Sequence, residues 1–80
     1  MYLIMSDFPS EELANKYAEK VNTDTNLKAK VYMDVDKVRE ETQYQFKLIA
    51  PIVLVSRGEL FDEAWAQSLV FDFGGKLTKT

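Results

Sequence analysis

Residues 44–59, with the sequence YQFKLIAPIVLVSRGE, form the most apolar stretch of the chain and decide which fold it predicts. Apolar and polar residues first alternate, from Tyr44 to Leu48, and an apolar run then continues to Val55. This pattern predicts strand structure, and the length of the apolar run favours a strand inside a sheet. Pro51 interrupts the run, and proline cannot donate a hydrogen bond to a ladder. The stretch is therefore one bent strand or two short strands that meet at the proline.

The residues that follow predict a helix and a final strand. Ser56-Arg57-Gly58-Glu59 matches the capping-box pattern, in which the serine caps the helix and the glutamate bonds back to it. We expect the helix to run from about Arg57 to Phe71 and to end at Gly74-Gly75. Lys76 to Thr80 predicts a short last strand, whose lysines suit an exposed sheet edge.

Two strands and one helix are expected before this stretch. Residues 2–6 predict a short buried strand, and residues 28–36 alternate as a half-buried strand does. Between them, apolar residues recur at helical spacing from Leu13 to Val21, and Asp7 or Ser10 can cap that helix. Residues 37–43 are charged and polar, which predicts a hairpin connection.

The expected order of elements is β-α-β-β-α-β, in one domain that spans residues 1–80. With right-handed crossovers, this order predicts a ferredoxin-like sandwich: an antiparallel sheet with both helices on one face. The third strand is then central, which agrees with its apolar character. A chain of this length buries only roughly 60–65% of its unfolded surface, so the core is thin.

Composition excludes several classes of function. The 80 residues include no cysteine and no histidine, so thiolate nucleophiles, zinc–thiolate sites and the commonest general base are missing. We expect no enzymatic activity, no metal and no cofactor. The net charge of −3 and the lack of a basic run argue against nucleic-acid binding. No signal peptide or membrane span is evident, and the lack of cysteine favours a cytoplasmic location.

Two groups of residues are candidate binding sites. Asp34 and Asp36 point to one side of the predicted strand, as carboxylate ligands of magnesium or calcium do, but no third ligand accompanies them. A solvated strand face explains this pair better. Tyr32, with Tyr44 or Phe46, could stack bases on an exposed sheet, but the basic–aromatic motif of RNA-binding domains is absent.

The second predicted helix carries an unusually wide apolar arc. The arc covers roughly 220° of the helix. It consists of a line of residues four apart, Phe61, Trp65, Leu69 and Phe73, beside Leu60, Ala64 and Phe71. A helix that packs on one sheet needs little more than about 100°. Either the helix ends near residue 70 and its last aromatic residues fold under the core, or Trp65 and Leu69 edge a surface for a partner.

These patterns favour a small non-catalytic protein-interaction module, an inhibitor or adaptor of the kind that phages and other mobile elements commonly encode. The predicted partner is another protein or a second copy of the chain, and the residues predicted to contact it are Trp65, Leu69, Phe73 and Tyr32. The alternative is an oligomeric regulatory domain that binds a small ligand. Neither hypothesis involves nucleic acid or a membrane.

We predict that magnesium, calcium or zinc leaves the melting temperature of the protein nearly unchanged. A metal that binds only the native state at 100 times its dissociation constant adds about 2.7 kcal/mol of stability. In a domain of this size, that gain raises the melting temperature by roughly 10 °C or more. Thermal melts with and without each metal make the test, and a rise of that size with magnesium would contradict the prediction and favour a site at Asp34 and Asp36.

Overall fold

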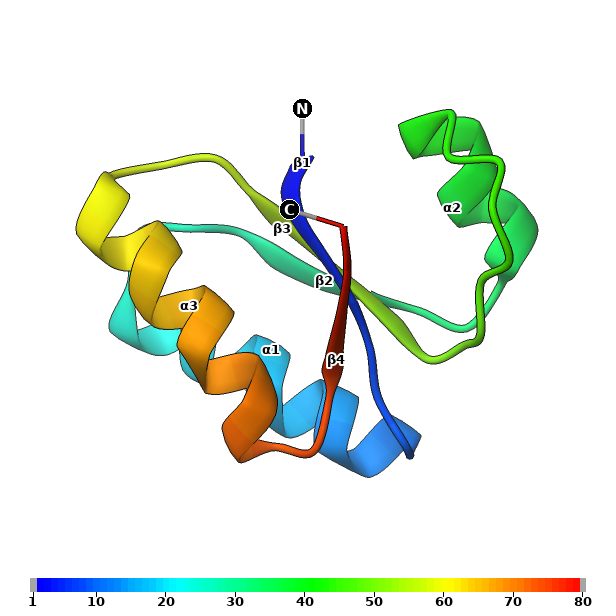
Figure 1. The fold of residues 1–80 in the computed structure, drawn as a ribbon. Coiled ribbons are helices and arrows are strands. Elements are labelled where there is room, and N and C mark those ends of the chain that lie inside the picture. The colour runs from blue at the N-terminus through cyan, green and yellow to red at the C-terminus, as the bar shows by residue number, and fades with distance from the viewer. Residues whose placement is uncertain (1, 80) are drawn as a thin grey trace.

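The computed structural model describes residues 2–79, which form four strands and three helices around one sheet (Figure 1). The order of elements is β-α-β-α-β-α-β. The bounds are β1 Tyr2–Asp7, α1 Glu11–Asp24, β2 Ala29–Tyr32, α2 Val35–Thr42, β3 Ile52–Ser56, α3 Leu60–Asp72 and β4 Lys76–Lys79. The predicted order β-α-β-β-α-β is therefore not matched, because a helix stands where a hairpin connection was expected.

The sheet has the strand order β2-β3-β1-β4, and all neighbouring strands are antiparallel. β3 lies inside the sheet, as its apolar sequence predicts, and four of its five residues are fully buried. β4 forms one edge, also as predicted, although Thr80 lies outside the described residues. The mixed α/β character of the domain is thus confirmed.

Helices cover both faces of the sheet, which explains why β3 is apolar throughout. α1 and α3 lie together on one face, and α2 lies on the other (Figure 1). Successive strand residues point to opposite faces. Val53 and Val55 accordingly join the core beneath α1 and α3, whereas Ile52 and Leu54 join the core beneath α2.

The helix α2 corrects the prediction for residues 28–43. The strand ends at Tyr32, and Asp34 caps α2 by accepting a hydrogen bond from the Asp36 backbone nitrogen at 2.9 Å. Val38 is fully buried under the sheet. Alternation and helical spacing overlap in so short a segment. The buried side chain of Val38 and the aspartate cap together favour the helix.

Residues 44–50, expected to form strand, are a connection without regular structure. Leu48 is buried, but Phe46 is 72% exposed and Ile49 is 59% exposed, so the alternation of apolar residues does not mark a core face. β3 begins at Ile52, directly after the proline. That position is one that a residue without a backbone donor tolerates.

The start of α1 and the end of α3 agree with the sequence, whereas α1 continues to Asp24 and the start of α3 differs. Ser10 caps α1, and Gly74 ends α3 with a positive φ of 75°. However, Ser56 ends β3 and accepts a hydrogen bond from the Lys28 nitrogen, so it does not cap α3. Glu59 is the residue before the helix and makes no side-chain cap.

Tyr17 joins the two helices that share a face. Its side chain is fully buried, and its hydroxyl donates a hydrogen bond of 2.9 Å to the carbonyl oxygen of Ala66 in α3. The ring also contacts Phe8 and Phe73, with centroids 5.0 and 6.3 Å away. Burial raises the pKa of Tyr17 above its ordinary value, so the phenol remains a donor at neutral pH.

Two substitutions that each remove one buried hydroxyl should have different effects on stability. Tyr17→Phe should lower the free energy of unfolding by about 1 kcal/mol, because the bond to Ala66 is lost. Ser6 is equally buried, but its hydroxyl has no hydrogen-bond partner within residues 2–79. Ser6→Ala should therefore leave stability unchanged or increase it. Urea denaturation measures both, and equal losses would contradict this view of the core.

Candidate functional site

The helix α3 is apolar on two opposite faces. Its inner face, which consists of Glu63, Ala66, Leu69 and Val70, is buried against the sheet and α1. Its outer face covers roughly 140° of the helix at about 100° per residue. This outer face consists of Leu60, Phe61, Ala64, Trp65, Ser68, Phe71 and, at its end, Asp72.

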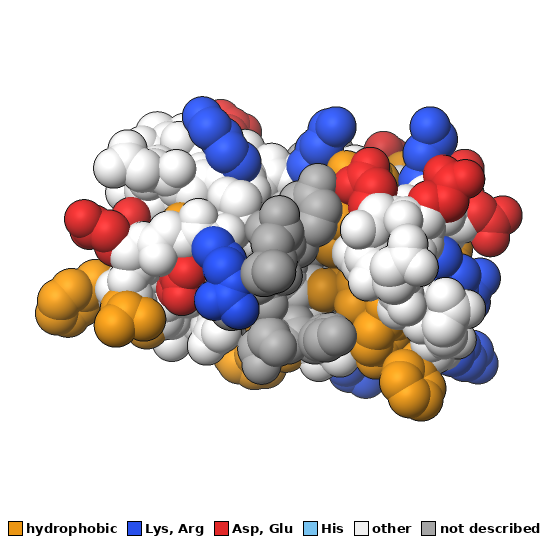
Figure 2. Space-filling view, turned by 90° about the horizontal axis from the view of Figure 1, so that it is seen from above, with side chains coloured by type: hydrophobic (Ala, Val, Ile, Leu, Met, Phe, Trp, Pro, Cys, Tyr) orange, Lys and Arg blue, Asp and Glu red, His pale blue; other side chains and the backbone are white. Residues whose placement is uncertain are grey.

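The outer face exposes large side chains to solvent. Phe61 is 89% exposed, Leu60 is 82% exposed and Phe71 is 60% exposed. Ala64 and Ser68 are also exposed and lie between these residues, so the face has large side chains at both ends and small ones in the middle. Figure 2 shows hydrophobic side chains protruding at the left-hand end of the molecule, where α3 begins.

Close packing at both ends of α3 fixes the rotation of the helix. Near its start, the buried Glu63 carboxylate accepts a hydrogen bond of 2.7 Å from the Gly58 nitrogen. At its end, a Cβ atom on Gly75 would lie 2.6 Å from the Phe8 ring and 2.9 Å from Val70. Only glycine lets these parts approach so closely. The outer face is therefore held on a rigid support.

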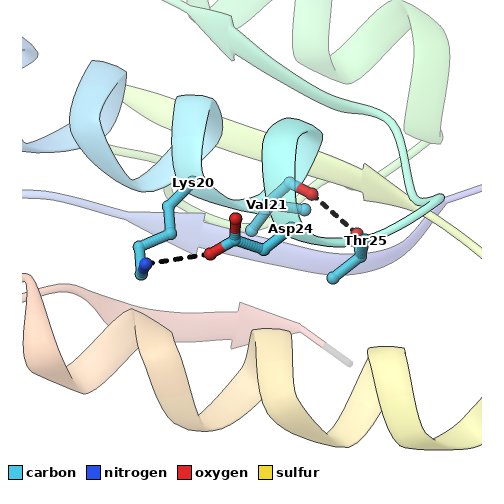
Figure 3. Close-up of polar contacts among 4 residues, drawn as sticks. All are labelled: Lys20, Val21, Asp24 and Thr25. Atoms are coloured by element: carbon cyan, nitrogen blue, oxygen red, sulfur yellow. Dashed lines mark hydrogen bonds and ion pairs between the residues drawn. The ribbon is translucent and has the colours of Figure 1, made fainter.

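Trp65 lies at the border between the outer face and α1. Its side chain is 36% exposed, and the Lys20 ammonium lies 6.0 Å from the centre of its ring. The same ammonium forms an ion pair with Asp24 at 2.9 Å (Figure 3). The contact over the ring is a cation–π geometry at its outer limit of distance. The Lys20 ammonium, which is paired with Asp24, therefore lies beside the Trp65 ring.

The structure brings only one of the four predicted partner-binding residues to the outer face. Trp65 is on its border, whereas Leu69 is buried in the inner face. Phe73 is half-buried and packs edge-on against Tyr17. Tyr32 is buried on the opposite side of the sheet, where its hydroxyl donates to the Glu41 carboxylate at 2.7 Å. Partner binding by these residues stays a prediction.

The most exposed apolar residues of the outer face were part of the predicted arc but were not singled out. Leu60, Phe61 and Phe71 have large apolar side chains of the kind that usually fill a core. Ala66 and Val70 mark the side of α3 that is buried instead. The small side chain of Ala66 lets Tyr17 approach the helix, so the side that carries Ala66 and Val70 turns toward the core. Phe71 does not fold under the core, because α3 continues to Asp72.

The aspartates considered as metal ligands have structural roles in α2. Asp34 caps α2, and Asp36 lies 3.6 Å from Arg39, so each has a local partner. Within residues 2–79, no group of three or more acidic side chains gathers as a metal site would require. The same residues include no helix with the length and apolar content of a membrane span.

Two of the surface hollows are open to solvent and are lined mostly by charged and polar residues. One, of about 360 Å³, lies along α1 between Lys16 and Asp24 and reaches Phe73. Another, of about 250 Å³, is lined by polar and acidic side chains, among them Asp24, Glu59 and Asp62. Sites for small ligands are usually enclosed, and hydrophobic and aromatic side chains form most of their lining. These hollows lend little support to the ligand-binding hypothesis.

Comparisons of the chain with protein-family models, with curated proteins and with solved structures find no match.

The two faces of α3 should respond differently to truncation. Leu69→Ala should lower the free energy of unfolding by about 2–5 kcal/mol, as truncation of a buried leucine does. Phe61→Ala should change it by no more than about 0.5 kcal/mol, because its ring is in solvent. Urea denaturation of both variants measures the difference. A large loss from Phe61→Ala would mean that the outer face is part of the core.

Proposed function

We propose that this domain is a non-catalytic protein-interaction module, an inhibitor or adaptor, that contacts its partner through the outer face of α3. The observation that carries the proposal is the exposure of Leu60, Phe61 and Phe71 on one side of a helix whose other side is fixed in the core. Groups of exposed apolar residues on small proteins commonly mark interaction sites.

The composition of the outer face supports this role. Aromatic residues are enriched in the buried centres of protein interfaces, and tryptophan is among their strongest contributors. Full burial of a leucine or phenylalanine side chain contributes about 1.5–3 kcal/mol. The three most exposed residues together could therefore supply on the order of 5–9 kcal/mol before the cost of association.

The residue inventory supports the non-catalytic part of the proposal. The chain has no histidine or cysteine to act as base or nucleophile. Folding of so short a chain without disulfides also suits a reducing compartment, so a cytoplasmic location belongs to the same proposal. The face of the sheet that would stack RNA bases is the one α2 covers, which favours a protein partner.

We also propose that the fold is a ferredoxin-like sandwich enlarged by one helix. In support, β1 and β3 take the inner positions of the sheet while β2 and β4 take the edges. In addition, α1 and α3 share one face. On this proposal α2 has replaced the simple hairpin connection between β2 and β3.

Site-specific photo-crosslinking tests the proposed function in cells of the natural host. A photoreactive phenylalanine analogue at position 61 should form one adduct, and the adduct should disappear when Phe71 is changed to serine. The matched control is the same analogue at position 46, because Phe46 is also highly exposed but follows α2.

Equal adducts from both positions, or none from position 61, would contradict the proposal. An adduct with twice the mass of the chain would identify a second copy as the partner and would favour the oligomeric alternative.

A further inference from the structure

The charged side chains of α3 itself are all negative, although Arg57 and Lys76 lie just before and after the helix. From Gly58 to Gly75 the chain has no lysine or arginine, but it has the four carboxylates of Glu59, Asp62, Glu63 and Asp72. Glu63 is buried and bound to the Gly58 nitrogen. The other three are at least partly exposed, two near the start of the outer face and Asp72 at its end. The apolar outer face is thus bordered by acid at both ends.

The neighbouring helix contributes one ion pair near the start of α3, which adds no net charge. Asp24, at the end of α1, lines the same hollow as Glu59 and Asp62. Lys20 is the cation beside Trp65, and its ion pair with Asp24 already balances its charge (Figure 3). Figure 2 shows acidic side chains beside the hydrophobic ones at this end of the molecule.

A second copy of the chain does not fit such a surface well. Antiparallel pairing of two outer faces would bring Asp72 of one copy toward Glu59 of the other, with Lys76 and Arg57 next to these carboxylates in the sequence. Parallel pairing would bring the Glu59 and Asp62 carboxylates of both copies together. Like charges that meet at an interface oppose association, and they do so most strongly in the parallel orientation. An anionic membrane surface is disfavoured for the same reason.

From this charge distribution, we infer that the outer face of α3 binds a protein segment with an apolar ridge flanked by lysine or arginine, such as a basic amphipathic helix. This inference rests on the proposed function and specifies the chemistry of the partner. Leucine-type side chains of the segment would contact Phe61, Trp65 and Phe71, and its cations would face Glu59, Asp62 and Asp72. The outer face is about 16 Å long, or three turns, which sets the minimum length of the segment.

Trp65 is the chain's one tryptophan and lies on the border of the outer face, so its fluorescence reports binding directly. We would titrate the protein with two synthetic helical peptides that lack tryptophan and share one leucine pattern. One carries lysine at its polar positions, and the other carries glutamate. The lysine peptide should shift the emission to the blue and bind at least about tenfold more tightly, and added salt should weaken it.

Matched variants locate the contact. Phe61→Ser should abolish binding of the lysine peptide, whereas Phe46→Ser, on an exposed residue of the connection after α2, should not affect it. Changing Asp62 and Asp72 to asparagine should bring the two peptides closer in affinity. Glu40→Gln, an exposed carboxylate of α2, is the control for charge and should leave the preference intact.

The contradicting outcomes separate this inference from the proposed function. If both peptides bind equally and Phe61→Ser abolishes the binding of both, the inference of a basic partner is refuted. The outer face then remains supported as an interaction surface. Binding that Phe61→Ser leaves unchanged would count against both. No binding of either peptide would overturn the inference, as would a preference for phosphatidylserine vesicles over the lysine peptide. A blue shift with protein concentration alone, with a dimer in sedimentation, would identify a second copy as the occupant.

Discussion

The hydrogen bond from the Tyr17 hydroxyl to the Ala66 carbonyl joins α1 to α3 across the core, and much else in the molecule depends on it. A tyrosine can reach a helix backbone only where the facing residue is small, and Ala66 meets that condition. The phenol is buried between Phe8 and Phe73, so an unpaired hydroxyl there would be costly. This contact, together with the burial of Leu69 and Val70, fixes which side of α3 turns toward the sheet.

Once that side is fixed, the opposite side of α3 must face solvent, whatever its composition. The sheet is already covered on both faces, by α1 and α3 on one and by α2 on the other, so no described element remains to cover Leu60, Phe61 and Phe71. The structure accordingly separates two uses of apolar residues on one helix. One side stabilises the fold, and the other supplies the surface on which the proposed function depends.

The sequence predicted the elements in which one pattern dominates. Ser10 and the spacing of Ala14, Tyr17 and Val21 define α1, and the apolar run at β3 defines the centre of the sheet. Where two patterns compete, the sequence was not decisive. Val35 fits either strand alternation with Val31 and Met33 or helical spacing with Val38. The burial of Val38 beneath the sheet favours the helix. For α3, with apolar residues all round, only tertiary contacts could distinguish the inner face from the outer one.

Solvent exposure of individual side chains in solution tests this division of α3 most directly. NMR relaxation with a soluble gadolinium chelate, at low protein concentration, measures it residue by residue. The structure predicts strong relaxation enhancement for the Phe61 and Phe71 rings and the Leu60 methyl groups, with little for the Leu69 and Val70 methyl groups. Protection of Phe61 and Phe71 equal to that of Val70 would contradict the account, because it would mean that both sides of the helix are buried.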